Sequence, residues 1–173
     1  MNKGLFVLVL IVVCSKTFAQ NVALVSNVPI PAKEFLWVYK KNNTAGTQSS
    51  FEDMSSYLNL YINFKLKVLD AKALKMDRDT GYLNEVKNYE SIIKAKIRVR
   101  GKDELKYIIN EYREGVLMFN ISEKKVWTVN RSVTSGAMTE EEQKQLEKEW
   151  IEELKKKYPV KIYEDELKKL VRI

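Results

Sequence analysis

The chain has 173 residues and a formal net charge of +7, and it contains one cysteine and no histidine. Without histidine it lacks the commonest general base, the commonest transition-metal ligand and every histidine-dependent catalytic triad. A single cysteine cannot close an internal disulfide. We therefore expect a protein that is not an enzyme and that holds no cofactor and no metal. Hydrolysis by paired carboxylates is the enzymatic alternative that the composition leaves open.

The first 19 residues have the pattern of an export signal. Lys3 precedes an unbroken apolar run over residues 5–13, and Thr17 and Ala19 are small residues placed for cleavage before Gln20. The apolar run is too short to span a bilayer, which takes about 20 residues. We expect cleavage between Ala19 and Gln20 and a single periplasmic domain over residues 20–173.

Cys14 leaves open an alternative in which its thiol is acylated and the protein is anchored by lipid. That processing favours a small residue just before the cysteine, and Val13 stands there instead. Export also limits the partners that the positive charge could attract. We expect neither a nucleic-acid partner nor a stable membrane span.

The first element after the signal is a short strand. Residues 22–25 are apolar and β-branched, as strands are. Residues 26–29 then indicate a turn, and Pro31 suits the first position of a helix. This helix is expected to end in the polar stretch over residues 40–48.

The second helix is the most strongly patterned element. Ser49 and Glu52 have the spacing of a capping box, in which each side chain satisfies the other residue's free backbone N–H. Beyond them, two apolar stripes run side by side, and only a narrow polar stripe remains. Because a helix with so wide an apolar face is packed on two sides, we place it at the centre of the core. The apolar stripes are Tyr57, Tyr61, Phe64, Val68 and Ala71, and Leu58, Ile62, Leu66, Leu69 and Ala73; the polar stripe is Ser56, Asn59, Asn63, Lys67 and Asp70.

The middle of the chain continues as helices. Apolar residues at helical spacing predict one helix over residues 80–100 and another with a stripe over residues 105–119, and Gly101 separates the two. A further helical piece is expected over residues 122–129.

The C-terminal part is predicted to contain two helices and a strand. Thr139 and Glu142 form a second capping box, and Pro159 ends the helix that it opens. Residues 160–163 alternate as a short strand, and residues 164–170 indicate a terminal helix. Because the edge of a lone strand needs a partner, we expect this strand to pair with the strand at the other end of the chain.

Four segments resemble SurA-type periplasmic chaperones and the related parvulin-type peptidyl-prolyl isomerases. The most specific is YLNLYINFKLKVLDAKALKMD over residues 57–77, which is similar to the family's second helix. The other three follow in the family's order: VALVSNVPIPAKEF (22–35), EYREGVLMFNISEKKVW (111–127) and EKEWIEELKKKYPVKIYED (147–165). Family members normally carry one or more parvulin domains with active-site histidines at a junction that residues 100–102 occupy here. The resemblance therefore implies the chaperone core without isomerase activity.

The resemblance implies a fold class and a function. The fold is expected to be mainly α: a helical SurA-like core formed by an N-terminal part (20–100) and a C-terminal part (101–173), with a small two-stranded pairing between the two ends. The function is expected to be that of a periplasmic holdase that binds unfolded outer-membrane or secreted proteins. The alternative is an envelope structural or accessory protein, whose groove is filled by its own side chains and which docks to one folded partner.

A holdase needs exposed aromatic and methionine side chains, because these give a large contact area without demanding one geometry. The candidate peptide-binding residues are Trp37, Tyr61, Phe64, Met118 and Trp127. Tyr61 and Phe64 fit a place in the core equally well. Trp37 is the better groove candidate, because lysines surround it on a polar side of its helix.

Overall fold

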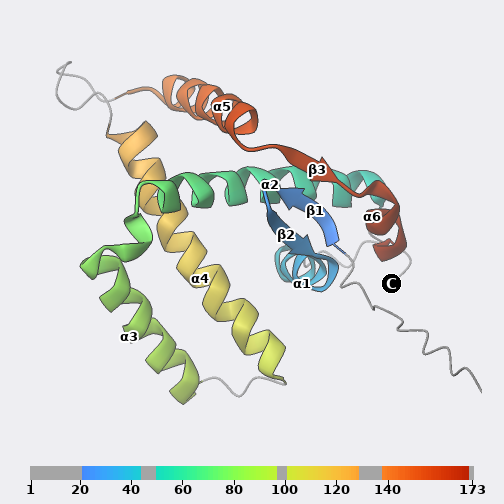
Figure 1. Cartoon of the computed structure of the whole chain (residues 1–173), viewed down its shortest axis with the longest axis horizontal. Coiled ribbons are helices and arrows are strands. Elements are labelled where there is room, and N and C mark those ends of the chain that lie inside the picture. Colours follow the sequence, from blue (N-terminus) through green and yellow to red (C-terminus); the bar gives the residue numbers. More distant parts are fainter. Residues whose placement is uncertain (1–20, 44–49, 97–100, 129–137, 172–173) are drawn as a thin grey trace, which may run out of the picture.

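The computed structural model describes residues 21–43, 50–96, 101–128 and 138–171. The export signal, the cleavage position between Ala19 and Gln20, and Cys14 lie outside the described residues. Helices make up most of the described chain, and one small antiparallel sheet joins its two ends (Figure 1). The predicted mainly-α class is therefore confirmed.

The sheet has three strands, with β1 (Asn21–Val25) in the middle. Its neighbours are β2 (Val28–Pro31) and β3 (Val160–Ile162), both antiparallel to it. Leu24 of β1 lies opposite Lys161 of β3. The predicted pairing between the two ends of the chain is confirmed.

The strand β2 was not predicted, because the turn before it is shorter than the sequence suggested. Ser26 adopts a left-handed φ of 56°, and Ser26 and Asn27 alone reverse the chain. Pro29 and Pro31 fit a strand here because β2 lies at the edge of the sheet, where a missing N–H breaks no ladder. Pro31 is the N-cap of the next helix rather than its first residue.

The central helix is α2 (Phe51–Ala73), as expected (Figure 1). Its Leu58, Ile62 and Leu66 are buried in the core. Among the described helices, those that pack on α2 include α1 (Ala32–Asn42), α4 (Lys102–Ser122), α5 (Glu140–Lys157) and α6 (Glu164–Leu170). Packing on several sides explains why so few positions of α2 are polar.

Part of the polar stripe of α2 is itself buried, beneath α5. Asp70 accepts hydrogen bonds from Trp150 Nε1 and Lys157 Nζ, each at 3.1 Å. Lys67 is also buried and pairs with Glu147. These polar contacts join α2 to α5, since a buried charge is tolerated only with such partners.

The helix α2 begins one residue later than predicted. Ser50, not Ser49, is its N-cap: Ser50 Oγ accepts from the N–H of Asp53 at 3.0 Å, and the Asp53 carboxylate accepts from the N–H of Ser50. The predicted capping box of Ser49 and Glu52 is wrong, because the overlapping S-x-x-D pattern of Ser50 and Asp53 forms the capping box instead. Ser49 itself lies outside the described residues.

The predicted capping box at the start of α5 is confirmed. Thr139 Oγ1 accepts from the N–H of Glu142 at 3.2 Å, and the Glu142 carboxylate accepts from the N–H of Thr139 at 2.8 Å. The helix ends at Lys157, two residues before Pro159.

A helical hairpin projects from α2. The short 3₁₀ turn η1 (Met76–Arg78) leads from α2 into α3 (Thr80–Lys96), which packs chiefly on α4 (Figure 1). The predicted end of α3, over residues 97–100, lies outside the described residues. The helix α4 continues into a π-helical turn, η2 (Glu123–Trp127), where a further helical piece was expected.

Candidate polypeptide-binding groove

Two hollows lie between α1 and α4. The inner hollow, of about 320 Å³, lies against α2, and the outer hollow, of about 720 Å³, is lined by α1 and α4 alone; among the described residues, the two share no lining residue. We call the two hollows together the α1–α4 groove. The inner hollow is lined by Val38, Asn42, Tyr57, Leu60, Tyr61, Phe64, Glu111 and Gly115; the outer hollow is lined by Lys33, Leu36, Trp37, Lys40, Lys41, Asp103, Glu104, Tyr107 and Ile108.

The inner hollow has an aromatic floor. The rings of Tyr61 and Phe64 stack with centroids 5.8 Å apart and planes 10° from parallel. Both side chains are half-buried, and Leu60 beside them is 66% exposed. On the opposite wall, Gly115 presents no side chain, and a Cβ placed there meets no atom within 4 Å. The floor is therefore open to an incoming apolar side chain.

The outer hollow combines two rings with cationic side chains. Trp37 of α1 and Tyr107 of α4 face each other with centroids 5.6 Å apart. The ammonium of Lys41 lies 5.5 Å from the Trp37 ring centre, a cation–π contact. Lys33 and Lys40 are exposed at the rim and form no ion pair with any described residue. The α1 wall of the outer hollow is therefore positively charged.

Side-chain bridges hold the walls of the groove in place. The buried Lys65 of α2 donates to Glu34 of α1 at 2.9 Å and to Glu114 of α4 at 2.6 Å. Tyr61 donates its hydroxyl to the same Glu34 carboxylate at 2.8 Å. One ion cluster thus fixes α1 and α4 against the floor, and the ion pair of Lys41 with Glu111 joins the two walls directly.

The protonation states within this cluster are well defined at neutral pH. Burial alone would lower the pKa of Lys65, but the negative charges of Glu114 and Glu34 outweigh it and raise that pKa. Burial, together with the charge of Glu34, raises the pKa of the Tyr61 phenol far above its ordinary value. Lys65 therefore stays charged, and Tyr61 stays a hydrogen-bond donor.

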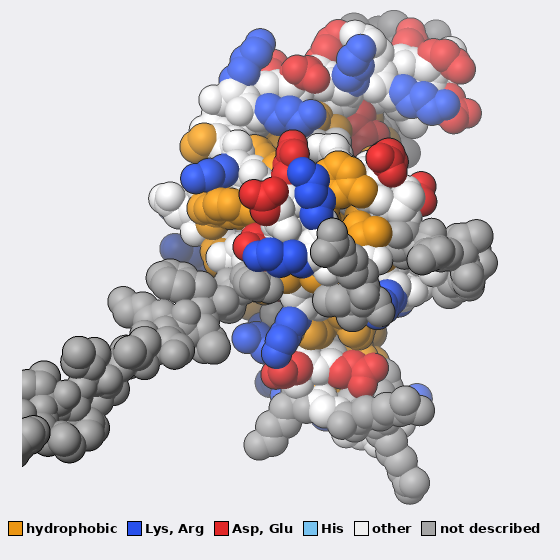
Figure 2. Space-filling model, turned by 90° about the vertical axis from the view of Figure 1, so that its right-hand side faces the viewer, with side chains coloured by type: hydrophobic (Ala, Val, Ile, Leu, Met, Phe, Trp, Pro, Cys, Tyr) orange, Lys and Arg blue, Asp and Glu red, His pale blue; other side chains and the backbone are white. Residues whose placement is uncertain are grey.

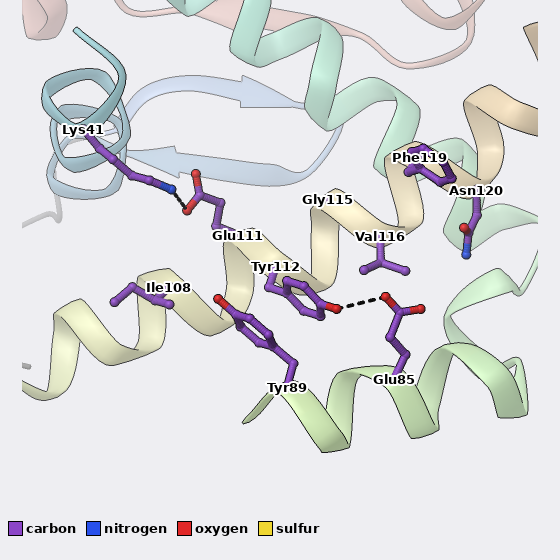
Figure 3. Close-up of a pocket in the computed structure, with 10 residues that line it drawn as sticks. All are labelled: Lys41, Glu85, Tyr89, Ile108, Glu111, Tyr112, Gly115, Val116, Phe119 and Asn120. Carbon is purple, nitrogen blue, oxygen red and sulfur yellow. Dashed lines mark hydrogen bonds and ion pairs between the residues drawn. The ribbon is translucent and has the colours of Figure 1, made fainter. Parts of the chain in front are cut away.

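A third hollow, of about 520 Å³, lies between α3 and α4 (Figure 3). The rings of Tyr89 and Tyr112 stack there with centroids 3.5 Å apart, and Tyr112 donates its hydroxyl to Glu85 at 2.9 Å. Glu111 and Gly115 line this hollow as well as the inner one. The third hollow therefore adjoins the inner hollow at these two residues of α4.

One face of the molecule has a mixed surface. Figure 2 shows the molecule from the right-hand side of Figure 1, and there the hydrophobic side chains form separate patches between basic and acidic ones. Such interspersed charge is typical of a solvated surface. Within the α1–α4 groove, aromatic rings are in contact with each other.

The structure brings three of the five predicted binding residues to the groove. Trp37 lines the outer hollow, and Tyr61 and Phe64 line the inner one. Met118 is half-buried and packs against the core instead. Trp127 lines neither hollow of the groove; it is 38% exposed at the far end of α4.

Five aromatic residues that line these hollows were not predicted as site residues: Tyr57, Tyr89, Tyr107, Tyr112 and Phe119. Tyr107 was missed because it lies off the apolar stripe expected for α4. Phe119 was placed on that stripe, but it is 53% exposed and packs edge-on against Trp127 at 5.1 Å. The buried face of α4 carries Ile109, Leu117 and Ile121. A stripe drawn through those positions would have left Phe119 on the surface.

No protein-family model, curated protein or solved structure matches this chain. The resemblance to SurA-type chaperones therefore stays a prediction. Among the residues that the structure describes, no helix has both the length and the apolar character needed to cross a bilayer.

Proposed function

We propose that this protein is an extracytoplasmic holdase that binds extended segments of unfolded outer-membrane or secreted proteins in the α1–α4 groove, without isomerase activity. The observation that carries the proposal is the aromatic floor of the groove. Tyr61 and Phe64 are half-buried, and the wall opposite them ends at Gly115, so an incoming side chain has room to stack.

The expected affinity suits a protein that must release its client. An aromatic side chain buries about 200 Å² on docking, which at about 25 cal/mol per Å² contributes about 5 kcal/mol before losses. Ordering an extended segment and restricting its motion offsets much of that gain. Two or three aromatic contacts then give micromolar binding, about 8 kcal/mol in total. Ring stacking accepts many sequences, as a holdase requires.

The alternative function, an accessory protein with one folded partner, predicts a groove filled from within by Trp127 or by the C-terminal helix. Within the described part of the chain, neither fills it: Trp127 packs on Phe119, and α6 packs against α1, α2 and β1. The open groove favours the holdase.

The test uses a matched pair of substitutions at Gly115. Gly115 lines both the inner and the third hollow, so Gly115→Trp adds an indole where the two hollows meet, whereas Gly115→Ala adds one methyl group in open space. Alanine is also the better helix former, by about 1 kcal/mol, so this control should fold at least as stably as the parent.

The assay is light scattering from an unfolded outer-membrane β-barrel that is diluted from urea in the presence of each protein. We expect the parent and Gly115→Ala to suppress aggregation at equimolar protein, and Gly115→Trp to need several times more. A parent protein that fails to suppress aggregation in stoichiometric excess, and that binds no barrel-derived peptide, contradicts the proposal. A prolyl-isomerisation assay should show no acceleration.

A further inference from the structure

The two outer edges of the sheet differ in their capacity to accept another strand. At the β2 edge, Pro29 lies opposite Leu24 and Pro31 follows at the end of the strand. Proline has no N–H to offer, so these residues blunt that edge in the way natural sheets commonly do. The β3 edge contains no proline within its three residues.

The backbone groups on the outer edge of β3 follow from its pairing with β1. Ser26 donates its N–H to Pro159 at 2.7 Å, and Tyr163 donates its N–H to Val22 at 2.9 Å. In an antiparallel ladder, hydrogen-bonded positions alternate, so Lys161 is also bonded to β1 while Val160 and Ile162 point their N–H and C=O groups outward. Among the described strands, β3 pairs with β1 alone, and the view of Figure 1 draws no described helix on the side of β3 away from β1.

The side chains at this edge also have a defined pattern. Val160 and Ile162 lie opposite the buried Val25 and Ala23, on the core face of the sheet, and Ile162 is 38% exposed. Lys161 points to the other face. It is exposed and forms no ion pair with any described residue, and its ammonium lies 5.1 Å from the ring centre of Tyr163.

We propose that the outer edge of β3 accepts an extended segment of a client polypeptide as a fourth strand of the sheet. The segment would carry apolar residues next to Val160 and Ile162 and an acidic residue next to Lys161. Strand addition of this kind obtains affinity from main-chain hydrogen bonds and specificity from alternate side chains. The inference rests on the proposed function for the nature of the partner, but it concerns a surface outside the α1–α4 groove.

A second copy of this chain fits the same edge less well. In the antiparallel register centred on the strand, the two copies would place Lys161 directly opposite Lys161. Like charges in that position are destabilising. An acidic client residue converts the same position into an attractive pair.

The direct test uses a fluorescein-labelled peptide of alternating threonine and valine with one central aspartate, measured by fluorescence anisotropy against the full chain. A second peptide carries N-methyl groups on the two valines that flank the aspartate. These valines would face Val160 and Ile162, so methylation removes the donors of the new ladder. We expect at least a tenfold loss of affinity, because buried acceptors are left unpaired.

Two substitutions in β3 separate the backbone from the side chain. Ile162→Pro removes the outward N–H, as Pro29 does on β2, whereas Ile162→Ala keeps that N–H and shortens the side chain. We expect Ile162→Pro to abolish peptide binding and Ile162→Ala to retain it within a fewfold. Far-ultraviolet circular dichroism and the melting temperature show whether both variants fold. If one variant fails to fold, the comparison of the N-methylated and parent peptides still tests the proposal on the unchanged protein.

Lys161→Glu tests the charge. A peptide with lysine in place of the central aspartate should then bind better than the aspartate peptide, a reversal of about fivefold in the ratio of dissociation constants. Gly115→Trp should leave all of these affinities unchanged, so that failure of the edge and failure of the groove are distinguishable.

Two results would overturn the proposal. One is equal binding of the N-methylated and the parent peptide. The other is a concentration-dependent dimer in sedimentation that Ile162→Pro converts to monomer, because the edge would then be occupied by a second copy of this chain.

Discussion

Replacing Lys65 by methionine removes the ammonium that Glu34 and Glu114 share. Lys65 is buried, and its Nζ lies 2.9 Å from one carboxylate and 2.6 Å from the other. Methionine matches the length of the aliphatic part and packs in the same space, so the substitution leaves no large cavity. The carboxylates of α1 and α4 are then left near each other without a cation between them.

The magnitude follows from the burial of the cluster. Removing one partner of a buried ion pair costs about 3–5 kcal/mol. The side chains of Glu34 and Glu114 keep 21% and 19% of their exposure, so water reaches both carboxylates and the lower end of that range applies. We expect Lys65→Met to lose about 3 kcal/mol out of the 5–15 kcal/mol typical of a domain. At 2–4 °C per kcal/mol, the melting temperature falls by about 6–12 °C.

The assay is urea denaturation followed by circular dichroism, with thermal melting as a second measurement. The control adds Glu34→Gln and Glu114→Gln to Lys65→Met, because uncharged amides no longer repel each other. We expect this triple variant to recover at least half of the lost stability. A loss below about 1 kcal/mol for Lys65→Met would be as small as that of an exposed salt bridge and would refute the reasoning. A triple variant that is no more stable than Lys65→Met would refute it as well.

Two further predictions concern the same helix. The pKa values of Tyr61 and Lys65 are raised above their ordinary values of 10.0 and 10.5, so the folded state binds more protons than the unfolded state above about pH 10. The stabilisation from these two groups is then fully present below that pH. Above it, the free energy of unfolding falls by up to about 1.4 kcal/mol per pH unit for each group. Urea denaturation at successive pH values should show a shallower decline for Tyr61→Phe than for the parent. Ser50→Ala removes the N-cap side chain that bonds to the N–H of Asp53, and it should lower the free energy of unfolding by about 1 kcal/mol. Glu52→Gln, at the position first expected in the capping box, should lower it by less than half of that. Equal losses in urea denaturation would contradict the assignment of the cap.

Helix and strand identities could be predicted wherever one local signal dominated. The box of Thr139 and Glu142 opens α5, and Pro159 separates α5 from β3, as expected. The start of α2 could not be fixed to the residue, because two overlapping boxes occur in sequence and both satisfy the spacing rule. The strand β2 was missed because Pro29 indicates a turn and Pro31 the first position of a helix, and only their place at a sheet edge makes them compatible with a strand.

The groove was harder to predict than the fold, because a ring in a groove and a ring in the core have the same helical periodicity. Tyr61 and Phe64 lie on the apolar face of α2, yet the axes of α1 and α4 leave both half-exposed. Gly115 gave no signal in the sequence, although it opens the wall opposite them. What decides between groove and core is the placement of neighbouring helices, which no single helix encodes.

The Lys65 cluster offers a physical reason why the groove stays open. Trp37 and Tyr107 already join α1 to α4 through a ring contact at 5.6 Å. Further apolar contact at the position of Lys65 would draw the two walls closer, since burying more apolar surface is favourable. A charged hub instead sets their separation, because each carboxylate must keep hydrogen-bonding distance from one ammonium. The triple variant, which recovers part of the stability without the charges, should also let the walls approach, and it should bind barrel-derived peptides more weakly than the parent. Relative to Lys65→Met, the two added amide substitutions would then raise stability without restoring peptide binding, an outcome that a purely structural role for the cluster does not predict.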